Sequence, residues 1–202
     1  VGGLRGLGIC LVLVLGACAH SPQVADIRPE IAGPLEKVAD GQAILLDMRD
    51  DRLRARIGRR GDATGGQAAI TAPGDLMERL AHAVLEGFAA QGFAPALRAK
   101  GALPQANEPV LRVSLRDLDY HAQNKILAGY VITVTAAVTL RMAGFEETYR
   151  SEQRQDAYIT PGADANNALI NKALNAVLAQ ALHDPGLRSH MLTRVAAAPA
   201  RE

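Results

Sequence analysis

The sequence predicts an α+β fold, in which an antiparallel sheet of five or six strands carries two amphipathic helices packed on one face. Two observations predict it. Two segments repeat apolar residues at helical spacing, and several others are short apolar or alternating runs bounded by glycine, proline or charged residues. A chain of 202 residues is long enough for one domain with a sizeable core and short for two. We therefore expect a single domain over residues 41–195.

The composition limits the classes of partner. Aromatic residues make up only 3% of the chain and tryptophan is absent, so the core must be built from leucine, valine, isoleucine and alanine. The 22 lysines and arginines against 21 aspartates and glutamates give a net charge of +1. Nucleic-acid-binding proteins carry a clear excess of basic residues. The charge balance therefore argues against a nucleic-acid partner.

The first residues have the three parts of a secretory signal, namely Arg5, an apolar run over 9–16, and the small residues Gly16 and Ala17. The run is shorter than the roughly 20 residues that a membrane-spanning helix needs. The sequence LGAC at 15–18 has the spacing of a bacterial lipobox. We therefore predict a signal peptide over 1–17, cleavage between Ala17 and Cys18, and acylation of Cys18. An ordinary signal peptide followed by an incidental cysteine is the alternative.

The predicted modification places a diacylglycerol and an N-acyl chain on Cys18, and we expect no other cofactor. Several acyl chains on one residue anchor a protein to a membrane without a spanning helix. Cys10 would be removed with the signal peptide, so the mature chain could form no internal disulfide. Ala19, rather than aspartate, follows Cys18, which favours the periplasmic face of the outer membrane over the inner membrane.

The two ends of the predicted mature chain lack the helix and strand patterns of its middle. Residues 19–40 contain three prolines and little periodicity, so we predict that 18–40 are the lipidated cysteine and an extended tether. Residues 196–202 read as a disordered tail.

The first half of the predicted domain begins with a central strand over 43–49. A charged, glycine-containing stretch follows as a long hairpin or loop, and a short strand covers 68–71. Asp75 opens a helix with Glu78 as its capping-box partner, and Gly92 ends it. The apolar positions of this helix follow helical spacing: Leu76, Leu80, Val84, Leu85 and Phe88. A strand near 93–97 comes next.

The second half contains a strand over 110–115, in which Leu111, Val113 and Leu115 share one face. Two long strands, 130–142 and 145–158, form a hairpin joined at Ala143-Gly144. Asp164 caps a second helix, which ends before Asp184, and a short helical piece covers 187–195. The second helix carries an unbroken apolar stripe: Leu169, Ile170, Ala173, Leu174, Val177, Leu178, Ala181 and Leu182.

With these elements in place, the chain resembles the YajG-type family of bacterial lipoproteins. The matching motifs are LGAC at 15–18, the strand with Asp47-Met48-Arg49, Ile57-Gly58, the helix closing on Gly92-Phe93, the strand LRVSLRDLDY, and the pair GYVITVTAAVTL and TYRSEQ. The resemblance covers nearly the whole chain. It implies a membrane-anchored, periplasm-facing domain without an established activity, and it therefore transfers no catalytic residues.

An arginine-rich segment over 49–60 is the candidate binding site. Guanidinium groups suit phosphate and carboxylate groups, which in the periplasm belong to lipopolysaccharide, anionic lipid headgroups or peptidoglycan peptides. In the alternative interpretation the segment is a solvated hairpin whose arginines pair with Asp50, Asp51 and Asp62. The arginines are Arg49, Arg52, Arg54, Arg56, Arg59 and Arg60.

The other candidate motifs give weaker indications of a metal, phosphate or catalytic site. Asp117, Asp119 and His121 alternate along an extended segment and could meet a cation. They share parity with the apolar Leu111, Val113 and Leu115, which indicates either a bulge or an exit of the chain from the sheet, and we predict no metal site. The glycines of GDATGGQ lack the lysine and hydroxyl residue of a phosphate loop. No serine-hydrolase or metalloprotease motif is present.

These observations favour a non-enzymatic lipoprotein that acts as a binding or assembly accessory of the cell envelope. Its partners would be the membrane, through the lipid anchor, and an envelope protein or anionic glycolipid. The second hypothesis is a binder of anionic envelope components through the 49–60 segment. The third is an enzyme with a dispersed site, which would need a pocket that includes Asp117, Asp119 or His121.

Overall fold

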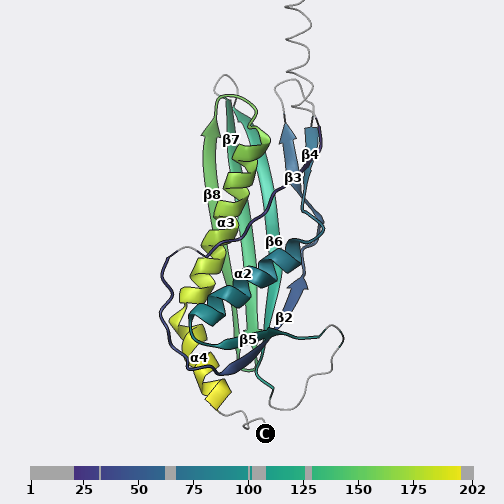
Figure 1. Ribbon diagram of the computed structural model, residues 1–202. Coiled ribbons are helices and arrows are strands. Elements are labelled where there is room, and N and C mark those ends of the chain that lie inside the picture. The colour runs from purple at the N-terminus through teal and green to yellow at the C-terminus, as the bar shows by residue number, and fades with distance from the viewer. Residues whose placement is uncertain are drawn as a thin grey trace, which may run out of the picture.

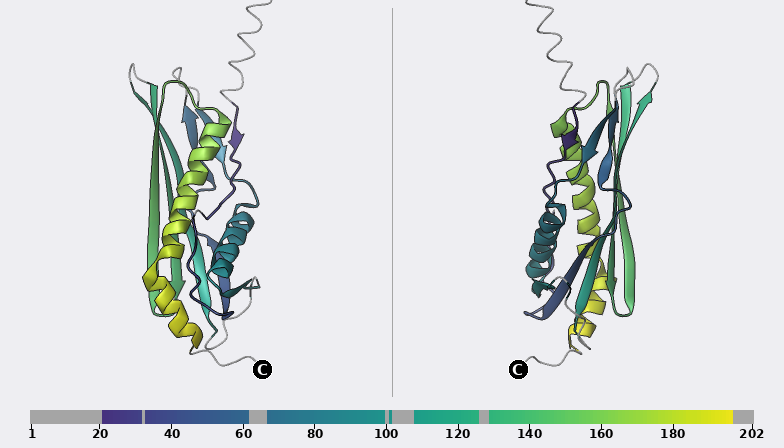
Figure 2. Two further views of the ribbon diagram at one scale, coloured as in Figure 1. Left: turned by 60° about the vertical axis from the view of Figure 1, so that its left-hand side comes forward. Right: turned by 90° about the vertical axis from the view of Figure 1, so that its right-hand side faces the viewer.

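The computed structural model describes residues 21–31, 33–61, 67–99, 101, 108–125 and 129–196. The predicted signal peptide, with Ala17 and Cys18, and residues 197–202 of the predicted tail lie outside the described residues. The described part is an elongated α+β domain in which one mixed sheet is covered by helices on one face (Figures 1 and 2). Its elements are β1 (Gln23–Val24), β2 (Ala43–Asp50), β3 (Arg56–Gly61), β4 (Gln67–Thr71), α2 (Leu76–Ala90), β5 (Ala94–Leu97), β6 (Val110–Lys125), β7 (Gly129–Met142), β8 (Phe145–Ala157), α3 (Ala163–His183) and α4 (Pro185–Ala196).

The sheet is organised around the long strand β6. On one side β7 pairs antiparallel along the whole of β6, and β8 pairs antiparallel with β7. On the other side two shorter strands follow one another: β2 pairs with the first part of β6, and β3 pairs with the second part. β5 lies beyond β2, while β4 and then β1 lie beyond β3. The five or six strands predicted from the sequence are thus too few, since the sheet has eight.

The prediction of a purely antiparallel sheet is also wrong. β2 is parallel to both β5 and β6, β3 is parallel to β6, and β1 is parallel to β4. After β2 the chain steps away from β6 over residues 51–55 and returns as β3 in the same direction, so no hairpin reverses it there. The hairpin expected in this stretch is instead formed by β3 and β4, and α2 then carries the chain across the sheet so that β5 starts beside the start of β2.

A bulge in β6 decides which side chains face the helices. The register shifts between Leu115 and Asp117, which leaves Arg116 as the extra residue. Before the bulge Leu111, Val113 and Leu115 are buried, and after it the buried positions are Leu118 and Tyr120. The predicted face of 110–115 and the predicted bulge are therefore both confirmed.

The helices pack on one face of the sheet, as predicted (Figure 2). All eight apolar residues of the predicted stripe on α3 are buried. The predicted caps differ in detail. Asp75 precedes α2, but its side chain pairs with Arg79 Nε at 2.9 Å and makes no cap hydrogen bond. Gly162, rather than Asp164, stands at the N-terminus of α3.

Gly92 lies just after the last residue of α2 and ends the helix, as predicted. It has a φ of 90°, which favours glycine, and its N–H donates to Ala89 O at 2.9 Å while Phe93 N–H donates to Phe88 O at 3.1 Å. A Cβ at this position would lie 2.0 Å from the carbonyl oxygen of Ala39. Glycine at this position therefore ends the helix and also leaves room for the backbone of a second segment, which contains Ala39.

That second segment is the strap, which we define as residues 21–40 without residue 32. It is extended, as the sequence predicts, but it does not hang free as a tether: it forms β1 and then runs along α3 and past α2 to β2 (Figure 1). Ala25, Ile27 and Ala39 are buried in the core. Ile31 and Leu182 approach Gly87 of α2 so closely that a Cβ there would overlap both. The strap is therefore part of the folded domain.

A buried polar network fastens the strap to α3 and β6. Tyr120 donates to Asn166 Oδ1 at 2.8 Å, and Asn166 Nδ2 donates to Gln23 Oε1 at 3.0 Å. Gln23 Nε2 donates to Asn167 Oδ1 at 2.9 Å and to Ala163 O at 3.2 Å. Burial raises the pKa of Tyr120 to about 12, so its hydroxyl remains a donor at neutral pH. These polar groups lie in the core at low cost because they satisfy one another.

Candidate functional site

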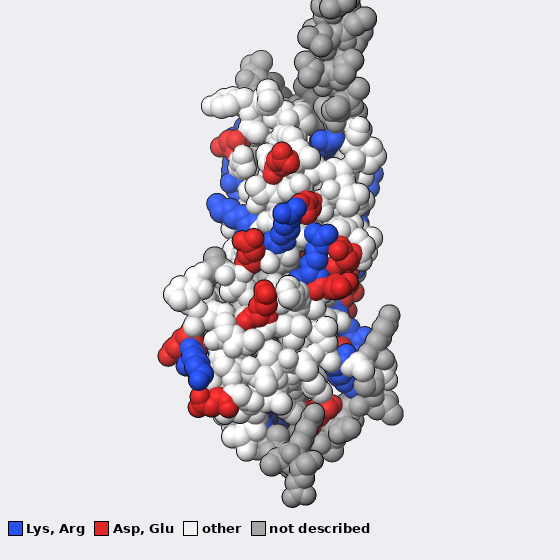
Figure 3. Space-filling model, viewed as in Figure 1, with Lys and Arg blue, Asp and Glu red and all other residues white. Residues whose placement is uncertain are grey.

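The helix-free face of the sheet, opposite α2 and α3, carries polar side chains from neighbouring strands. The strand register places Arg112 beside Arg141 and Ser114 beside Thr139, and Thr139 shares a 2.8 Å hydrogen bond with Thr148. Because side chains alternate between the faces, the apolar neighbours of these residues point toward the helices. On the helix side, acidic and basic side chains are interspersed between uncharged surfaces (Figure 3).

Four hollows on the helix-free face join into one groove along the sheet. The hollow at the β7–β8 turn shares Arg112, Arg141 and Glu146 with the next one, which shares Arg116 and Arg150 with a third. The third shares Arg54, Arg56 and Asp119 with the fourth. Their volumes along the groove are about 610, 430, 360 and 300 Å³.

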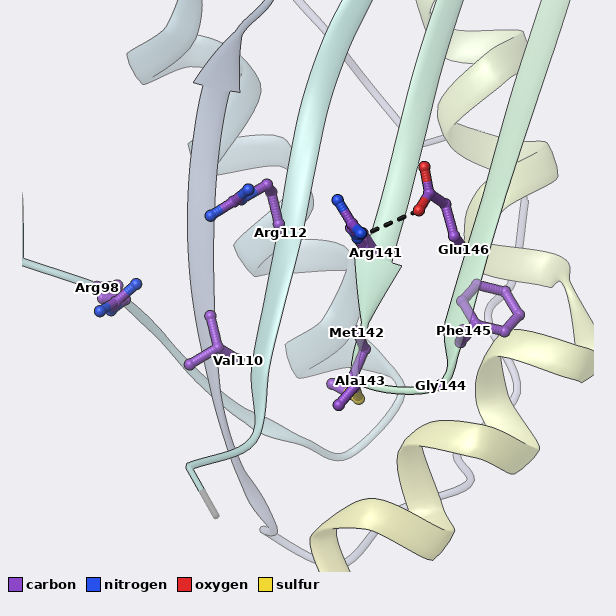
Figure 4. A pocket seen from close by; sticks show the side chains of 9 residues that line it. All are labelled: Arg98, Val110, Arg112, Arg141, Met142, Ala143, Gly144, Phe145 and Glu146. Carbon is purple, nitrogen blue, oxygen red and sulfur yellow. Dashed lines mark ion pairs between the residues drawn. The ribbon is translucent and has the colours of Figure 1, made fainter. Parts of the chain in front are cut away.

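The largest hollow, of about 610 Å³, is shown in Figure 4. Arg112 and Arg141 line it from adjacent strands, and Met142 and Phe145 supply apolar surface. Both arginines have carboxylate partners: Arg112 Nε lies 3.1 Å from Asp47 Oδ2, and Arg141 Nε lies 3.1 Å from Glu146 Oε2. The charge of Arg141 is therefore paired within the protein, and Arg112 shares the carboxylate of Asp47 with Arg49.

The third hollow lies beside β6, at the gap between the end of β2 and the start of β3. We call it the break pocket. Three of its arginines, Arg54, Arg56 and Arg150, form no ion pair with any part of the chain that the structure describes. Arg116, from the bulge of β6, pairs with Asp51 at 3.2 Å. The full lining is Arg52, Leu53, Arg54, Arg56, Arg116, Asp117, Leu118, Asp119, Thr135 and Arg150.

Arg52 gives the break pocket an unsatisfied donor. Its side chain is only 7% exposed, and Nε and Nη2 donate to the two carboxylate oxygens of Asp50 at 2.8 Å each. Its Nη1 is buried and has no hydrogen-bond partner. These hydrogen bonds from Arg52 hold the pKa of Asp50 below its usual value, although partial burial opposes the shift. A buried guanidinium N–H without an acceptor is costly.

The arginines predicted as one site are divided by the fold. Arg49 pairs with Asp47 at 2.9 Å on β2, and Arg59 lies in register with His121 and lines the fourth hollow. Arg60 is 7% exposed and donates through Nη2 to Ser21 O at 2.5 Å, which fastens the strap. Only the middle three of the six arginines, those at 52, 54 and 56, gather around the break pocket.

The predicted pairing with neighbouring aspartates is correct for one partner. Asp50 pairs with Arg52 as expected, but Asp51 pairs with Arg116 of β6. Asp62 lies outside the described residues. The segment is thus partly neutralised by its own aspartates, as the alternative interpretation proposed, and partly left charged.

Asp117, Asp119 and His121 follow the bulge and face the same side of the sheet as the arginines. Asp117 and Asp119 line the break pocket, and Asp119 and His121 line the fourth hollow. Among the described residues, no three side chains of histidine, cysteine, aspartate or glutamate lie close enough together to hold a metal ion.

Sequence reasoning missed the arginines that β6, β7 and β8 add to the groove: Arg112, Arg116, Arg141 and Arg150. Arg112 and Arg141 alternate with buried residues of their strands, so their parity could have placed them on the polar face. Nothing local shows that they meet the 49–60 segment, because that depends on the parallel pairing of β2 and β3 with β6.

A family model described as an uncharacterized lipoprotein matches residues 29–191. The chain belongs to this family of uncharacterised lipoproteins. The membership confirms the resemblance to YajG-type lipoproteins. No curated protein matches the chain. Among the described residues, no helix of this lipoprotein is both long and apolar enough to cross a membrane.

Solved structures resemble the lipoprotein in fold. The crystal structure of protein XCC0632 from Xanthomonas campestris, of the DUF330 family, superposes with a TM-score of 0.52 at 13% identity and covers 85% of this chain and 98% of that one. A minor lipoprotein from Acinetobacter baumannii matches with a TM-score of 0.38 at 9% identity and covers 80% of this chain and 96% of that one. At these identities the first likeness supports the α+β fold and nothing finer.

Proposed function

We propose that this lipoprotein is a non-enzymatic binding protein of the cell envelope, anchored through Cys18 to the periplasmic face of the outer membrane, and that its break pocket binds an anionic group. The observation that carries the proposal is the break pocket itself. Three arginines without ion pairs surround it, and the buried Nη1 of Arg52 lacks an acceptor.

Phosphate and carboxylate oxygens are the acceptors that fit this arrangement. Guanidinium groups bind both through charge-assisted hydrogen bonds, which are stronger than neutral ones. Asp117 and Asp119 share the pocket, so the ligand must approach the arginines while keeping its negative oxygens away from these carboxylates. A phosphate or carboxylate carried on a larger, partly neutral molecule satisfies this requirement. Lipopolysaccharide, anionic lipids and peptidoglycan peptides all carry such groups.

The test is a variant in which Arg54, Arg56 and Arg150 are changed to glutamine. Binding to lipopolysaccharide, to vesicles that contain phosphatidylglycerol and to peptidoglycan peptides is measured separately at low and high salt. The source whose affinity falls at least about tenfold is the ligand, because several charge-assisted contacts are lost at once. The affinity of the unaltered protein should also weaken as salt rises.

The control variant removes three positive charges from the helix side, through Arg28→Gln, Lys37→Gln and Lys172→Gln. These side chains are exposed and lie outside the groove. The proposal requires the control variant to bind as the unaltered protein does. Equal losses in both variants, or salt-insensitive binding unchanged by the pocket variant, would contradict it.

The enzymatic alternative has a specific observation in its favour, since Asp117 and Asp119 line the break pocket and His121 lies next to it. Turnover of an envelope substrate by the purified protein, abolished by Asp119→Asn and His121→Gln, would replace the binding proposal with an enzymatic one.

A further inference from the structure

We infer that the end of the domain formed by the start of the strap and the β8–α3 turn rests on the lipid bilayer. This inference rests on the proposed anchoring through Cys18. It adds an orientation: the long axis of the sheet stands upright on the membrane, and the groove lies along the side of the domain. Three observations carry it.

The first observation is the short distance between the anchor and the folded domain. Only three residue steps separate Cys18 from Ser21, so even a fully extended chain spans no more than about 11 Å. A flexible tether over 18–40 would have left the domain free to turn. The strap is instead fixed from Ser21 onward, since Arg60 Nη2 donates to Ser21 O and Gln23 bonds to Asn166 and Asn167.

The second observation is the place where the strap begins. Gln23 Nε2 donates to the carbonyl of Ala163, the first residue of α3, at 3.2 Å. Residues 158–162 form the turn before Ala163, at the same end of the molecule (Figures 1 and 2). The predicted anchor and this turn therefore lie at one end of the sheet.

The third observation is that this turn is apolar and exposed. Tyr158 is 91% exposed and Ile159 is 78% exposed, and they are the one adjacent pair among the large apolar side chains that the described residues expose. Gly129, with a φ of 87°, lets β8 end close to β7, because a Cβ there would lie 2.2 Å from Ala157 O. Tyrosine favours the headgroup level of a membrane, and isoleucine gains from burial beneath it.

The break pocket is too distant for the same contact. Leu53, which is 99% exposed, lies in the break pocket beside Asp117 of β6. At a strand rise of roughly 3.3 Å per residue, this level is about 26 Å from Lys125 at the end of β6. Leu53 is therefore a matched control: an exposed leucine that the anchor cannot bring to the bilayer in this orientation.

The experiment uses the full, lipidated protein in vesicles of phosphatidylethanolamine and phosphatidylcholine, which carry no net charge and so offer the break pocket no anionic lipid. Ile159→Cys and Leu53→Cys are each labelled with an environment-sensitive fluorophore. The sequence contains two native cysteines, Cys10 and Cys18, so the labelled thiol is unique once the signal peptide with Cys10 is removed and Cys18 is acylated. We expect a blue shift, and quenching by lipid-borne quenchers, for the label at 159 and neither effect for the label at 53.

Flotation of the vesicles separates the two levels of the proposal. If the protein floats with the vesicles but the label at 159 shows no shift, or both labels shift equally, the orientation is wrong while the anchoring stands. If the protein does not float, the proposed anchoring through Cys18 fails, and the orientation fails with it.

Discussion

At the residue scale, Asp184 shows how one side chain joins three elements. Its carboxylate accepts hydrogen bonds from the Tyr149 hydroxyl of β8 and from the N–H of Gly186 at 2.6 Å. Pro185 is the first residue of α4, a position where its missing N–H costs nothing. The Asp-Pro-Gly sequence therefore ends α3, starts α4 and fastens both to the sheet.

We predict that Asp184 contributes to stability in a pH-dependent way. Partial burial tends to raise the pKa of Asp184, but the bonds from Tyr149, Gly186 and Leu187 outweigh it, so the pKa lies below its usual value. Stabilisation by the ionised carboxylate is then complete above the unfolded pKa of about 3.9 and is lost as the pH falls through the lowered folded pKa. Asp184→Asn should cost about 1 kcal/mol at neutral pH, because hydrogen bonds to a charged acceptor are stronger than those to a neutral amide oxygen. It should also reduce the loss of stability that the unaltered protein shows as the pH falls.

Thermal unfolding between neutral pH and pH values below the unfolded pKa measures this effect. Asp164→Asn, in the first turn of α3, is the control for a change of charge alone. An acid limb that is identical in Asp184→Asn and the unaltered protein would contradict the assigned role.

At the scale of elements, the spacing of three asparagines on α3 matches the spacing of the strap's backbone N–H groups. Asn167, Asn171 and Asn175 accept hydrogen bonds from the backbone N–H groups of every second strap residue, Asp26, Arg28 and Glu30, at 3.1, 2.7 and 2.8 Å. Four helical residues rise about 6 Å, and two extended residues rise about 6.6 Å, so the two spacings nearly coincide. The asparagines thereby satisfy the backbone of a segment that has no strand partner along α3.

We predict that Asn171→Ala loosens the strap. The change leaves Arg28 N–H without its acceptor and removes the donor to Asp26 O, which is 2.9 Å from Asn171 Nδ2. The expected cost is about 1–2 kcal/mol, because two partly exposed hydrogen bonds are lost. Hydrogen exchange of the backbone amides at 26–30 should accelerate more than exchange in β7. Lys172→Ala, on the exposed side of the same helix, should change neither, and equal exchange in both variants would refute the role of the asparagines.

At the scale of the whole molecule, the strap makes the domain larger than the predicted 41–195. Ile27 is fully buried, and the strap supplies Ala25 and Ala39 to the same core as β2, α2 and α3. The long strand β6 contacts β7 on one side and both β2 and β3 on the other, so the sheet has one continuous core face. Removing the strap would uncover that core along the helices.

We predict that a chain beginning at Ser21 folds and that a chain beginning at Gly41 does not. The first keeps every described contact of the strap, whereas the second loses its buried apolar side chains and exposes those beneath them. Thermal unfolding and size-exclusion chromatography measure the difference. A monomeric chain from Gly41 that unfolds cooperatively at the temperature of the longer one would show that the strap is dispensable.

Sequence reasoning located most elements within a few residues, because helix and strand patterns are local. The stripe of α3, the end of α2 at Gly92, the β7–β8 hairpin and the bulge in β6 all follow from residues near one another in the chain. The strand near 93–97 and the helical piece near 187–195 also exist, as β5 and α4. Of the break pocket, the sequence indicated the arginines at 52, 54 and 56 and the aspartates at 117 and 119, but as two separate candidate sites.

What the sequence by itself determined is most of the helices and strands, the buried face of the strand over 110–115 and the resemblance to a lipoprotein family, since apolar periodicity, turn residues and short motifs specify these. Only the tertiary structure decided that β2 and β3 lie parallel to β6, that the strap is part of the core, and that Arg116 and Arg150 join the three arginines of the break pocket. The physical reason is that pairing between distant strands depends on which surfaces bury one another best. No pattern within one strand specifies which distant strand it pairs with.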